Sequence, residues 1–276
     1  MNLYTDPTLT IGKLARRTGV GVSTLRAWER RFGFPVPARL ESGHRRYTER
    51  DVEAIVAALR ERHGGLSIAL ALERAKTMSL GPRSSLFGAL RHTLSDIAPA
   101  VLSPRGMLML SRAIEDEIAG RADQAILIGA FQHERFWRAS EARWRNLATT
   151  TKATIVLATL PHRRHRDHLW EVRIDPTTPI AREWVVLCDS PTFSACLAGV
   201  ELPGAADRVF EVLWTTEPIA VRDVARAAAD IARTQEPALD QILQPALKTP
   251  VATRYDSVRT TTALSNRVVA YMDRRH

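Results

Sequence analysis

One short segment, residues 23–32, carries side chains that can bind nucleic acid at a regular spacing. At 100° per residue, Ser23, Arg26 and Arg30 share one face of a predicted helix. Arginine can bind guanine through two hydrogen bonds, and serine can hold a phosphate. The opposite face is apolar and consists of Leu25, Trp28 and Phe32. This pattern suits a DNA-reading helix or a surface helix with solvated arginines, and the flanking sequence favours the first.

The residues before this segment predict a second helix that a tight turn joins to it. Thr10 is the expected N-cap of that helix, apolar residues follow at helical spacing, and Gly19 stops it. Ser23 is the expected N-cap of the basic helix. A helix, a glycine-containing turn and a basic second helix together predict a helix-turn-helix.

A wing and another helix are predicted next. Residues 33–37 contain two prolines and cannot continue the helix. Residues 41–47 are expected to form a two-stranded wing with a turn at Gly43 and with Arg45 and Arg46 near its tip. Residues 48–51 have the pattern of a helix N-terminus with an acidic first turn, and this helix is expected to run through Arg62.

Residues 9–78 resemble the DNA-binding domain of the MerR family of transcription regulators. The resemblance rests on five ordered motifs: Ile11-Gly12-x-Leu14-Ala15, Thr24-Leu25-Arg26-x-Trp28-Glu29-Arg30, Pro37-x-Arg39, Gly43-x-Arg45-x-Tyr47 and Asp51-Val52. The Trp-Glu-Arg-Arg-Phe-Gly-Phe-Pro version, residues 28–35, is similar to the branch found in light- and cobalamin-responsive regulators. No part of the chain resembles a cobalamin-binding domain, so the likeness concerns the DNA reader.

The resemblance implies a homodimer that binds a two-fold site in double-stranded promoter DNA and distorts it to realign promoter elements. RNA polymerase is a further candidate partner. The operator sequence, and whether the protein activates or represses, do not follow from the sequence. The expected DNA-binding residues are Thr10, Ser23, Thr24, Arg26, Trp28, Arg30, Arg31, Arg39, His44, Arg45, Arg46 and Tyr47.

The distribution of charge agrees with a DNA reader at the N-terminus. The chain of 276 residues has a net charge of +9 and a composition, 45% hydrophobic and 25% charged, that is typical of globular domains. Residues 1–80 hold 14 Lys and Arg against 8 Asp and Glu, a net of +6, and the other 196 residues contribute +3. The basic excess therefore lies where phosphates have to be neutralised.

The sequence favours a cytoplasmic protein. No window of 18 apolar residues predicts a membrane span, and the first residues do not form a signal peptide. Cys188 and Cys196 fit a reducing compartment. Without neighbouring His or Cys ligands, we interpret the two cysteines as small buried hydrophobic residues rather than as a metal or redox pair.

From residue 86 onward, helical and strand patterns alternate and predict an α/β domain with helices around a mixed sheet. The apolar run 125–131 is typical of a central strand that is covered on both faces. In the helix 104–121, the inward stripe is Met107, Ser111, Ile114 and Ile118. Further helices are expected over 85–97, 133–149, 208–214 and 217–233, and further strands over 154–160, 169–174, 183–189 and 193–201.

Residues 86–230 resemble the DICT domain, a sensory module named for diguanylate cyclases and two-component systems. The matching motifs are Ser111 to Glu117, Gly129-Ala130-Phe131-Gln132-x-Glu134-Arg135-Phe136-Trp137-Arg138, Arg143-Trp144-x-x-Leu147-Ala148, Arg182-Glu183-Trp184 and Phe210-Glu211-x-x-Trp214-Thr215. The resemblance implies a sensor without naming its signal, and a small molecule and a light-related signal both remain candidates. No cofactor is identified.

Three regions follow from these patterns: a winged helix-turn-helix domain over 1–80, a sensory domain over 81–235 and a tail over 236–276. The family's long dimerisation helix is missing after Met78, where residues 79–85 read as a linker. We therefore expect residues 1–80 alone to be monomeric and dimerisation to reside in residues 86–276. The tail is expected to end in a helix that presents Leu264, Val268, Tyr271 and Met272 on one face, for packing on its own domain or on a second chain.

A ligand site is expected at strand ends, where helix N-termini offer free backbone N–H groups. The expected pocket lies near Gln132, where the strand 125–131 ends, and Trp137, Trp144 and Trp184 are its candidate aromatic wall or plain core residues. The candidate ligand-binding residues are Glu115, Gln132, Arg135, Trp184 and Asp189.

The remaining polar clusters are better explained without catalysis. Consecutive residues on a helix diverge by 100°, so Glu115, Asp116 and Glu117 are interpreted as salt-bridge partners rather than as one metal or acid–base site. The run 162–168 is interpreted as a solvated basic loop, with metal or phosphate binding as the alternative. The sequence has no phosphate-cradling glycine loop, nucleophile elbow or zinc-type spacing, so no enzyme is expected. The two functions that remain are a signal-responsive regulator and a constitutive or architectural DNA-binding protein whose α/β domain serves oligomerisation.

Overall fold

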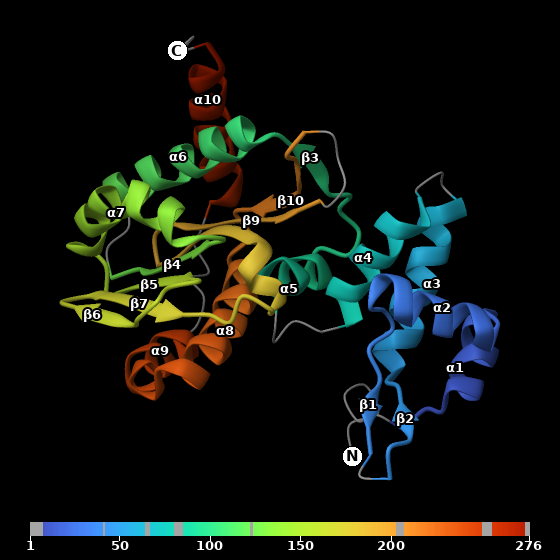
Figure 1. Cartoon of the computed structure of the whole chain (residues 1–276). Coiled ribbons are helices and arrows are strands. Elements are labelled where there is room, and N and C mark those ends of the chain that lie inside the picture. Colours follow the sequence, from blue (N-terminus) through green and yellow to red (C-terminus); the bar gives the residue numbers. More distant parts are fainter. Residues whose placement is uncertain are drawn as a thin grey trace. The chain divides into compact units, whose positions relative to one another are not determined.

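The structure is a computed structural model that describes residues 8–40, 42–63, 67–79, 85–121, 124–202, 207–249 and 256–273. The chain divides into two compact units, Met1–Gly81 and Pro82–His276. The first is a helical unit with a small wing, and the second is a mixed-sheet α/β unit (Figure 1). The predicted fold class, a winged helix-turn-helix followed by an α/β domain with a mixed sheet, is confirmed.

The first unit is built on one apolar core. Its described elements are α1 (Ile11–Thr18), α2 (Val22–Phe32), β1 (Ala38–Arg39), β2 (Arg45–Arg46), α3 (Glu49–His63) and α4 (Ile68–Ser79). The helices α3 and α4 pack against each other, and α1 packs on α3. Leu14, Leu25, Ile55 and Leu72, one from each helix, are at most 1% exposed and meet in this core.

The second unit is organised by an eight-stranded mixed sheet with the order β3-β10-β9-β8-β4-β5-β7-β6. The strands β4, β5 and β7 run parallel, and all other neighbouring pairs in this sheet are antiparallel. The strands are β3 (Ala100–Leu102), β4 (Ile126–Phe131), β5 (Ala153–Ala158), β6 (Arg164–Arg166), β7 (Leu169–Arg173), β8 (Glu183–Asp189), β9 (Ser194–Glu201) and β10 (Phe210–Thr215). The described helices are α5 (Leu86–Thr93), α6 (Pro104–Arg121), α7 (Glu134–Ala148), η1 (Pro179–Arg182), α8 (Pro218–Gln235), η2 (Pro237–Leu239), α9 (Asp240–Lys248) and α10 (Ser257–Asp273).

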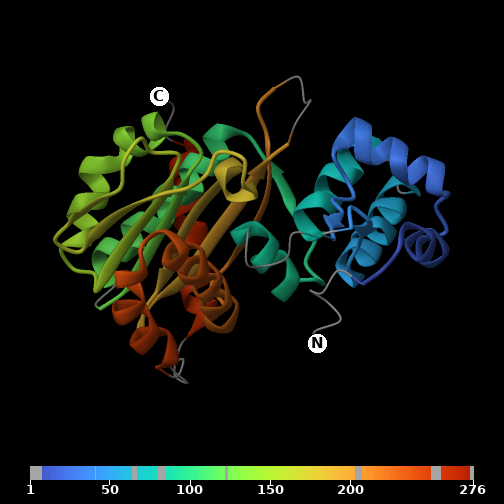
Figure 2. The ribbon, with the colours of Figure 1, turned by 60° about the horizontal axis from the view of Figure 1, so that its bottom comes forward.

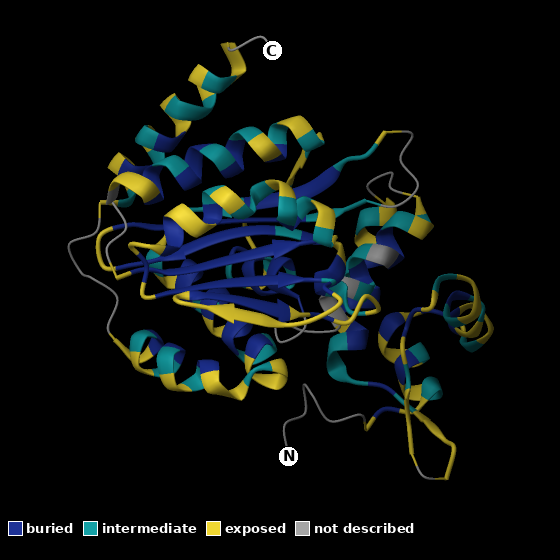
Figure 3. Cartoon of the chain, turned by 60° about the vertical axis from the view of Figure 1, so that its left-hand side comes forward, coloured by how far each residue is buried: buried dark blue, intermediate teal, exposed yellow. Residues whose placement is uncertain are grey.

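Helices cover both faces of this sheet, as the apolar run at β4 predicts. Ile126, Ile128 and Ala130 pack in a core with α5, α8 and α9, whereas Leu127 and Phe131 pack in a second core with α6, α7 and α10. Figures 1 and 2 show α6 and α7 on one side of the sheet and α8 and α9 on the other. In Figure 3 the central strands are buried between these layers, while β6 is exposed along its whole length at the edge.

Glycine at position 129 allows α7 to pack closely on β4. A Cβ atom there would lie 2.4 Å from the ring of Trp144 and 2.8 Å from the ring of Phe131. Real Cβ atoms do not approach other atoms this closely, so any larger residue would push α7 away from the sheet. The Gly129-to-Phe131 motif is therefore explained by packing.

The boundaries of several elements differ from the predictions. Residues 208–214 were predicted as a helix, but residues 210–214 belong to the strand β10. The alternation of this segment buries Phe210 and Val212 on one face of the sheet and Leu213 on the other. The helix predicted over 85–97 ends at Thr93. The basic run 162–168 is not wholly a loop, since residues 164–166 form the edge strand β6.

The tail packs on the second unit. Leu243 and Leu247 of α9 lie in the core beneath α8, despite Pro245 within that helix. On α10, Leu264 is buried against α6, and Val268 and Tyr271 pack beside it. Of the two alternatives for the terminal helix, these residues follow the first, packing on its own domain, whereas Met272 is 61% exposed. Among the described helices, none combines the length and the apolar character that crossing a membrane requires.

Candidate functional site

The helix α2, which was predicted to read DNA, has glycine caps at both ends, Gly21 and Gly33, and an apolar inner face. The Thr10 hydroxyl accepts a hydrogen bond from the Lys13 backbone N–H at 3.3 Å, which caps α1 as predicted. Gly19 has a φ of 71°, a left-handed conformation that ends α1 and turns the chain toward α2. The expected cap at Ser23 is wrong: α2 begins at Val22 and its N-cap is Gly21, which leaves the Ser23 side chain exposed.

The outer face of α2 is polar and accessible. Ser23, Arg26 and Arg30 are exposed, as is Thr24, and Leu25 on the inner face is 1% exposed. Neither Arg26 nor Arg30 forms an ion pair within the described part of the chain. Their guanidinium groups are therefore available to an external acceptor, and their position on one face matches the predicted periodicity.

The wing is tied to both α2 and the start of α1. The Arg45 guanidinium donates to the Glu29 carboxylate of α2 at 3.1 Å. Leu9 and Tyr47 exchange two backbone hydrogen bonds of 2.9 Å. Gly43, with a φ of 76°, makes the turn of the wing. These bonds fix the wing relative to α2 (Figure 1).

Not all expected contact residues reach the surface. Arg31, Arg39, His44 and Arg45 are exposed, and Arg46 is half-buried with its guanidinium donating to the Arg45 carbonyl at 3.0 Å. As a correction, Trp28 and Tyr47 are core residues, 7% and 1% exposed, because the inner face of α2 and the end of the wing close over α3. Burial, together with the nearby Glu29 carboxylate, raises the pKa of Tyr47. These two side chains belong to the apolar core that supports α2 and the wing.

In the second unit, Gln132 lies at the carboxyl end of β4 within a saturated polar cluster. Its amide nitrogen donates to the Arg182 carbonyl at 3.0 Å and to the Glu201 carboxylate at 2.6 Å, and its amide oxygen accepts from Arg208. The Arg208 guanidinium also lies 5.0 Å from the ring centres of Phe136 and of Phe210. Burial acts to raise the pKa of Glu201, but the hydrogen bonds that Arg208 and Gln132 donate to it outweigh this effect. The pKa of Glu201 is therefore lowered.

The other candidate ligand residues do not converge on Gln132. Trp184 lies in this cluster, with its ring centre 5.7 Å from that of Phe210. Arg135, in contrast, is exposed and lies over the ring of Phe136. Asp189 is at the opposite end of the sheet, because β8 is antiparallel to β4 and Asp189 pairs with Ile126. Sequence reasoning treated β8 as if its carboxyl end met that of β4, and the antiparallel register overturns this.

Asp189 forms a buried ion pair instead. Its carboxylate accepts two hydrogen bonds from Arg222 of α8, and the two side chains are 3% and 9% exposed. Arg222 also donates to the carbonyls of Leu247 and Thr249, at 3.1 and 2.6 Å, where α9 ends. This pair joins the sheet to α8 and α9, and no sequence pattern linked the two residues.

The acidic run on α6 is a salt-bridge network, as interpreted. Arg143 of α7 bonds to Glu115 and Asp116, and Arg267 of α10 bonds to Glu117 at 2.6 Å. The hydrogen bonds that Tyr271 and Arg143 donate to Asp116 outweigh the effect of burial and lower the pKa of its carboxyl. Glu115 also accepts the Trp144 indole N–H at 3.1 Å, so its polar atoms serve the packing of α6 on α7.

One buried carboxylate was not foreseen. Glu183 is fully buried and accepts hydrogen bonds from the Ser85 hydroxyl and from the backbone N–H groups of Leu86 and Phe87 at the start of α5. Burial raises the pKa of Glu183 to about 7, although the three hydrogen bonds oppose this. The Arg182-Glu183-Trp184 motif hinted at this site, but its partner is 98 residues earlier in the chain.

The described residues contain no group of three or more His, Cys, Asp or Glu side chains arranged to hold a metal ion. Cys188 and Cys196 are free and buried, as interpreted, and they lie in the cores on opposite faces of the sheet. Burial raises the pKa of both thiols, which keeps them protonated.

Comparison with known proteins agrees with this geometry. Residues 9–73 match the family model described as "MerR HTH family regulatory protein", and residues 84–202 match the model described as "Sensory domain in DIguanylate Cyclases and Two-component system" (DICT). The first match covers α1 to α4 up to residue 73, and the second extends from the start of α5 to the end of β9.

Curated relatives match a part of the chain. The HTH-type transcriptional repressor CarA of Myxococcus xanthus is 48% identical over 73 residues, which are 25% of this chain and 25% of that protein. The HTH-type transcriptional repressor CarH of the same organism is 35% identical over 83 residues, 30% of this chain and 28% of that protein. The HTH-type transcriptional regulator MlrA of Escherichia coli is 41% identical over 46 residues, 17% of this chain and 19% of that protein. The chain thus spans about a quarter of the length of the first two relatives, and it joins a helix-turn-helix region of the MerR family to a DICT sensory domain.

Proposed function

We propose that the protein is a DNA-binding transcription regulator whose DICT domain senses a signal and modulates promoter binding. The observation that carries the first half is the outer face of α2, where Arg26 and Arg30 are exposed and form no ion pair within the described residues. Exposed arginines on a helix that is fixed from behind suit the reading of guanine in a major groove. In this proposal the protein acts in the cytoplasm as a homodimer on a two-fold site, with RNA polymerase as a candidate partner.

Arg26 and Arg45 have different roles in this proposal. Arg26 is exposed on α2 and forms no ion pair with the residues that the structure describes, which suits a base contact. Arg45 belongs to the wing and is already held by Glu29 at 3.1 Å, which suits a fixed contact to the phosphate backbone. The relatives' names, transcriptional repressor and transcriptional regulator, support the same class of function.

The second half rests on the Gln132 cluster. Gln132, Glu201 and Arg208 form a polar group walled by Phe136 and Phe210 at a strand end. A small polar signal that replaces Glu201 on Arg208 would loosen the connection between β4 and β9, which supplies a two-state element for regulation. If the second unit serves oligomerisation alone, no small molecule will change DNA affinity, and this outcome separates the two candidate functions.

The proposed roles are tested by substitution on a DNA duplex selected from a random-sequence pool. We expect Arg26→Ala to cost ~1–3 kcal/mol on the selected duplex and to relax base preference. Arg45→Ala should weaken binding to selected and scrambled duplexes alike and reduce the dependence on salt. Arg62→Ala, an exposed arginine at the end of α3, is the matched control for loss of one charge.

Titration of both duplexes at several salt concentrations measures these effects. If Arg26→Ala and Arg45→Ala lose affinity equally on the selected and the scrambled duplex, the assignment of base reading to α2 is wrong. If the control variant loses as much affinity as either, the effects reflect net charge rather than the two contacts.

A further inference from the structure

The second unit contains a group of arginines that its carboxylates do not neutralise. Arg164 and Arg166 of β6 form no ion pair among the described residues, and Arg173 at the end of β7 forms none either. Elsewhere in this unit many arginines are bound to carboxylates, as Arg222 is to Asp189 and Arg143 is to Glu115, although Arg105, Arg135 and Arg259 form no ion pair among the described residues either. Arg164, Arg166 and Arg173 differ from these because they lie together on two neighbouring strands, β6 and β7, at the outer edge of the sheet.

The segment that contains β6 is exposed and mostly basic. Residues 161–168 are all exposed, and β6 is the last strand of the sheet. Between residues 162 and 168 there are three arginines and three histidines against one aspartate. We call this surface the β6 edge; it consists of His162, Arg163, Arg164, His165, Arg166, His168 and Arg173.

The arginines of β6 are spaced along the strand and do not converge on one point. Arg164 pairs with Glu171 and Arg166 with Leu169, so the two arginines lie on the same face of β6, roughly 7 Å apart for two residues of strand. His165 lies on the other face, where its ring stacks on Trp170 with 3.4 Å between ring centres. This stacking fixes β6 and hence the direction of its arginines.

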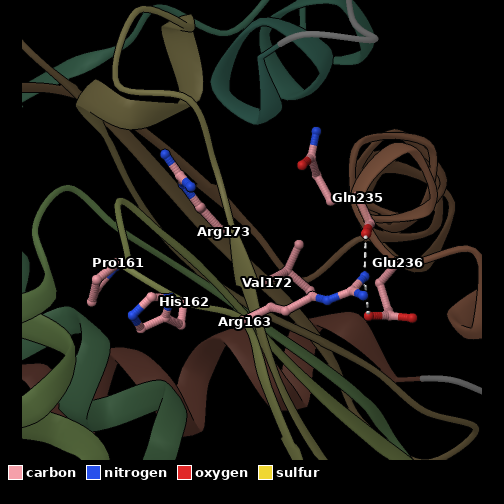
Figure 4. Close-up of a pocket in the computed structure, with 7 residues that line it drawn as sticks. All are labelled: Pro161, His162, Arg163, Val172, Arg173, Gln235 and Glu236. Atoms are coloured by element: carbon pink, nitrogen blue, oxygen red, sulfur yellow. Dashed lines mark hydrogen bonds and ion pairs between the residues drawn. The ribbon is translucent and has the colours of Figure 1, made fainter.

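A hollow on each side of the edge continues the basic surface. One, of about 520 Å³, is lined by His162, Arg163 and Arg173 and by the end of α8, where Arg163 bonds to Glu236 at 3.2 Å (Figure 4). In Figure 4 the Arg173 guanidinium points away from that ion pair. The other hollow, of about 390 Å³, is lined by Arg166, His168 and Arg145 at the end of α7.

Of the nearby carboxylates, Glu171 and Glu141 are already engaged, whereas Asp167 lies within the exposed run and lines the second hollow. Glu171 is 4% exposed and held by Arg138 of α7, and Glu141 binds Arg138 and Arg145. Charged residues on an edge strand commonly prevent two sheets from joining, but this purpose is served by either sign of charge. It does not explain why α7, β6 and β7 all contribute arginines to the same surface.

We propose that the β6 edge binds the phosphate backbone of duplex DNA, in addition to the contact made by α2. A row of guanidinium groups along an exposed strand matches a row of phosphates, whereas a small anion would need donors that converge in an enclosed pocket. The inference rests on the proposed function in that it assumes a DNA-bound protein, but the contact it describes is independent of base sequence.

The test compares full-length variants on a random-sequence duplex of about 60 base pairs, long enough to extend beyond one helix-turn-helix site. The variant Arg164→Ser/Arg166→Ser removes the two unpaired charges. Arg226→Ser/Arg233→Ser is the matched control, because it removes two exposed arginines of α8 that pair with Asp223 and Asp230. An unchanged thermal unfolding midpoint shows that both variants are folded.

We expect the β6 variant to bind this duplex about tenfold more weakly and to lower the slope of log affinity against log salt by roughly 0.9 for each phosphate that it no longer neutralises. The control variant should match the parent protein. On a selected duplex, the β6 variant should keep its base preference, whereas Arg26→Ala loses it, so the two proposals fail separately. The proposal is overturned if the β6 variant keeps the affinity and the salt slope of the parent protein. This is also the result expected if the β6 edge binds an acidic protein instead of DNA. Equal losses in the control would also overturn it.

Discussion

In the first unit, Arg26 and Arg30 are exposed on α2 and form no ion pair with described residues, whereas in the second unit Arg143 and Arg222 each bind carboxylates beneath or between helices. The residue type is the same, and the environments are opposite. An arginine that already holds a carboxylate in the folded protein contributes to packing. Removing a buried arginine of this kind leaves the carboxylate buried without a partner, which destabilises the fold. An arginine without such a partner costs the fold little and remains available to phosphates and bases.

This difference explains why net charge alone is a poor guide to function. Residues 1–80 hold a net charge of +6, yet Arg17 and Arg45 in that region are bound to Glu49 and Glu29. The remaining 196 residues have a net charge of only +3, yet the β6 edge concentrates unpaired arginines. The pairing of each arginine, rather than its number, distinguishes a binding surface from a structural network.

Among the arginines bound to carboxylates, we expect substitution of Arg222 to have the largest effect on stability. We expect Arg222→Ala to lower the free energy of unfolding of the second unit by ~3–5 kcal/mol, because Asp189 and two carbonyl groups lose their donor in the interior. Urea unfolding followed by tryptophan fluorescence measures this, since five of the six tryptophans lie in the second unit. DNA affinity at low denaturant should be unchanged.

The double variant Arg222→Met/Asp189→Leu provides the control. Replacing both charges by apolar side chains removes the uncompensated carboxylate, so we expect it to recover much of the lost stability. If Arg222→Ala changes the free energy of unfolding by less than 1 kcal/mol, on the order of a surface pair, the buried pair is not structural and the contrast between the two units does not hold.

The sequence predicted most of the fold because its signals are local. The helices α6 and α7, the apolar strand β4 and the glycine at the end of α1 follow from periodicity and turn chemistry within a few residues. Residues 208–214 were misassigned because their apolar spacing fits a helix as well as a strand, and pairing with β9 decides the matter. Register between strands is a long-range property that a single sequence does not reveal.

The candidate sites show the same limit. The outward face of α2 was predictable, since Ser23, Arg26 and Arg30 lie within two helical turns of one another. The grouping of Gln132 with Asp189 was wrong because it depends on the direction of β8. The contact between Ser85 and Glu183, and the burial that perturbs that carboxyl, arise from tertiary packing across 98 residues.

The next largest expected effect concerns Glu183, a buried carboxylate whose described hydrogen-bond partners include no arginine. Burial raises the pKa of Glu183 from 4.5 to about 7. Between these values the folded protein binds a proton that the unfolded chain has released, so stability from this group is present below about pH 4.5 and is lost as the pH rises through about 7. The total change is on the order of 3 kcal/mol, since each pKa unit corresponds to ~1.4 kcal/mol. Urea unfolding from pH 4.5 to pH 8 measures it.

The variant Glu183→Gln isolates this contribution, because the amide has nearly the same shape and does not titrate. The difference in the free energy of unfolding between the parent protein and this variant should change with pH in the window from 4.5 to about 7 and level off above it. The arginine-bound Asp116 has a lowered pKa and acts in the opposite direction at more acidic pH. A difference that stays constant across the window would contradict the raised pKa and leave Glu183 as a plain helix cap.

The smallest expected effect is at a paired arginine on the surface of the first unit. Arg17 donates two hydrogen bonds to Glu49, at 3.0 and 2.8 Å, and its side chain is 54% exposed. Water already solvates both groups, so we expect Arg17→Ala to lower the free energy of unfolding by no more than ~1 kcal/mol. Urea unfolding of the full chain followed by circular dichroism, together with a double-mutant cycle with Glu49→Ala, measures the pair. High salt should reduce the coupling further, because exposed charges are screened. A coupling energy as large as that of the Arg222 pair would show that pairing alone, without burial, decides which arginines are structural.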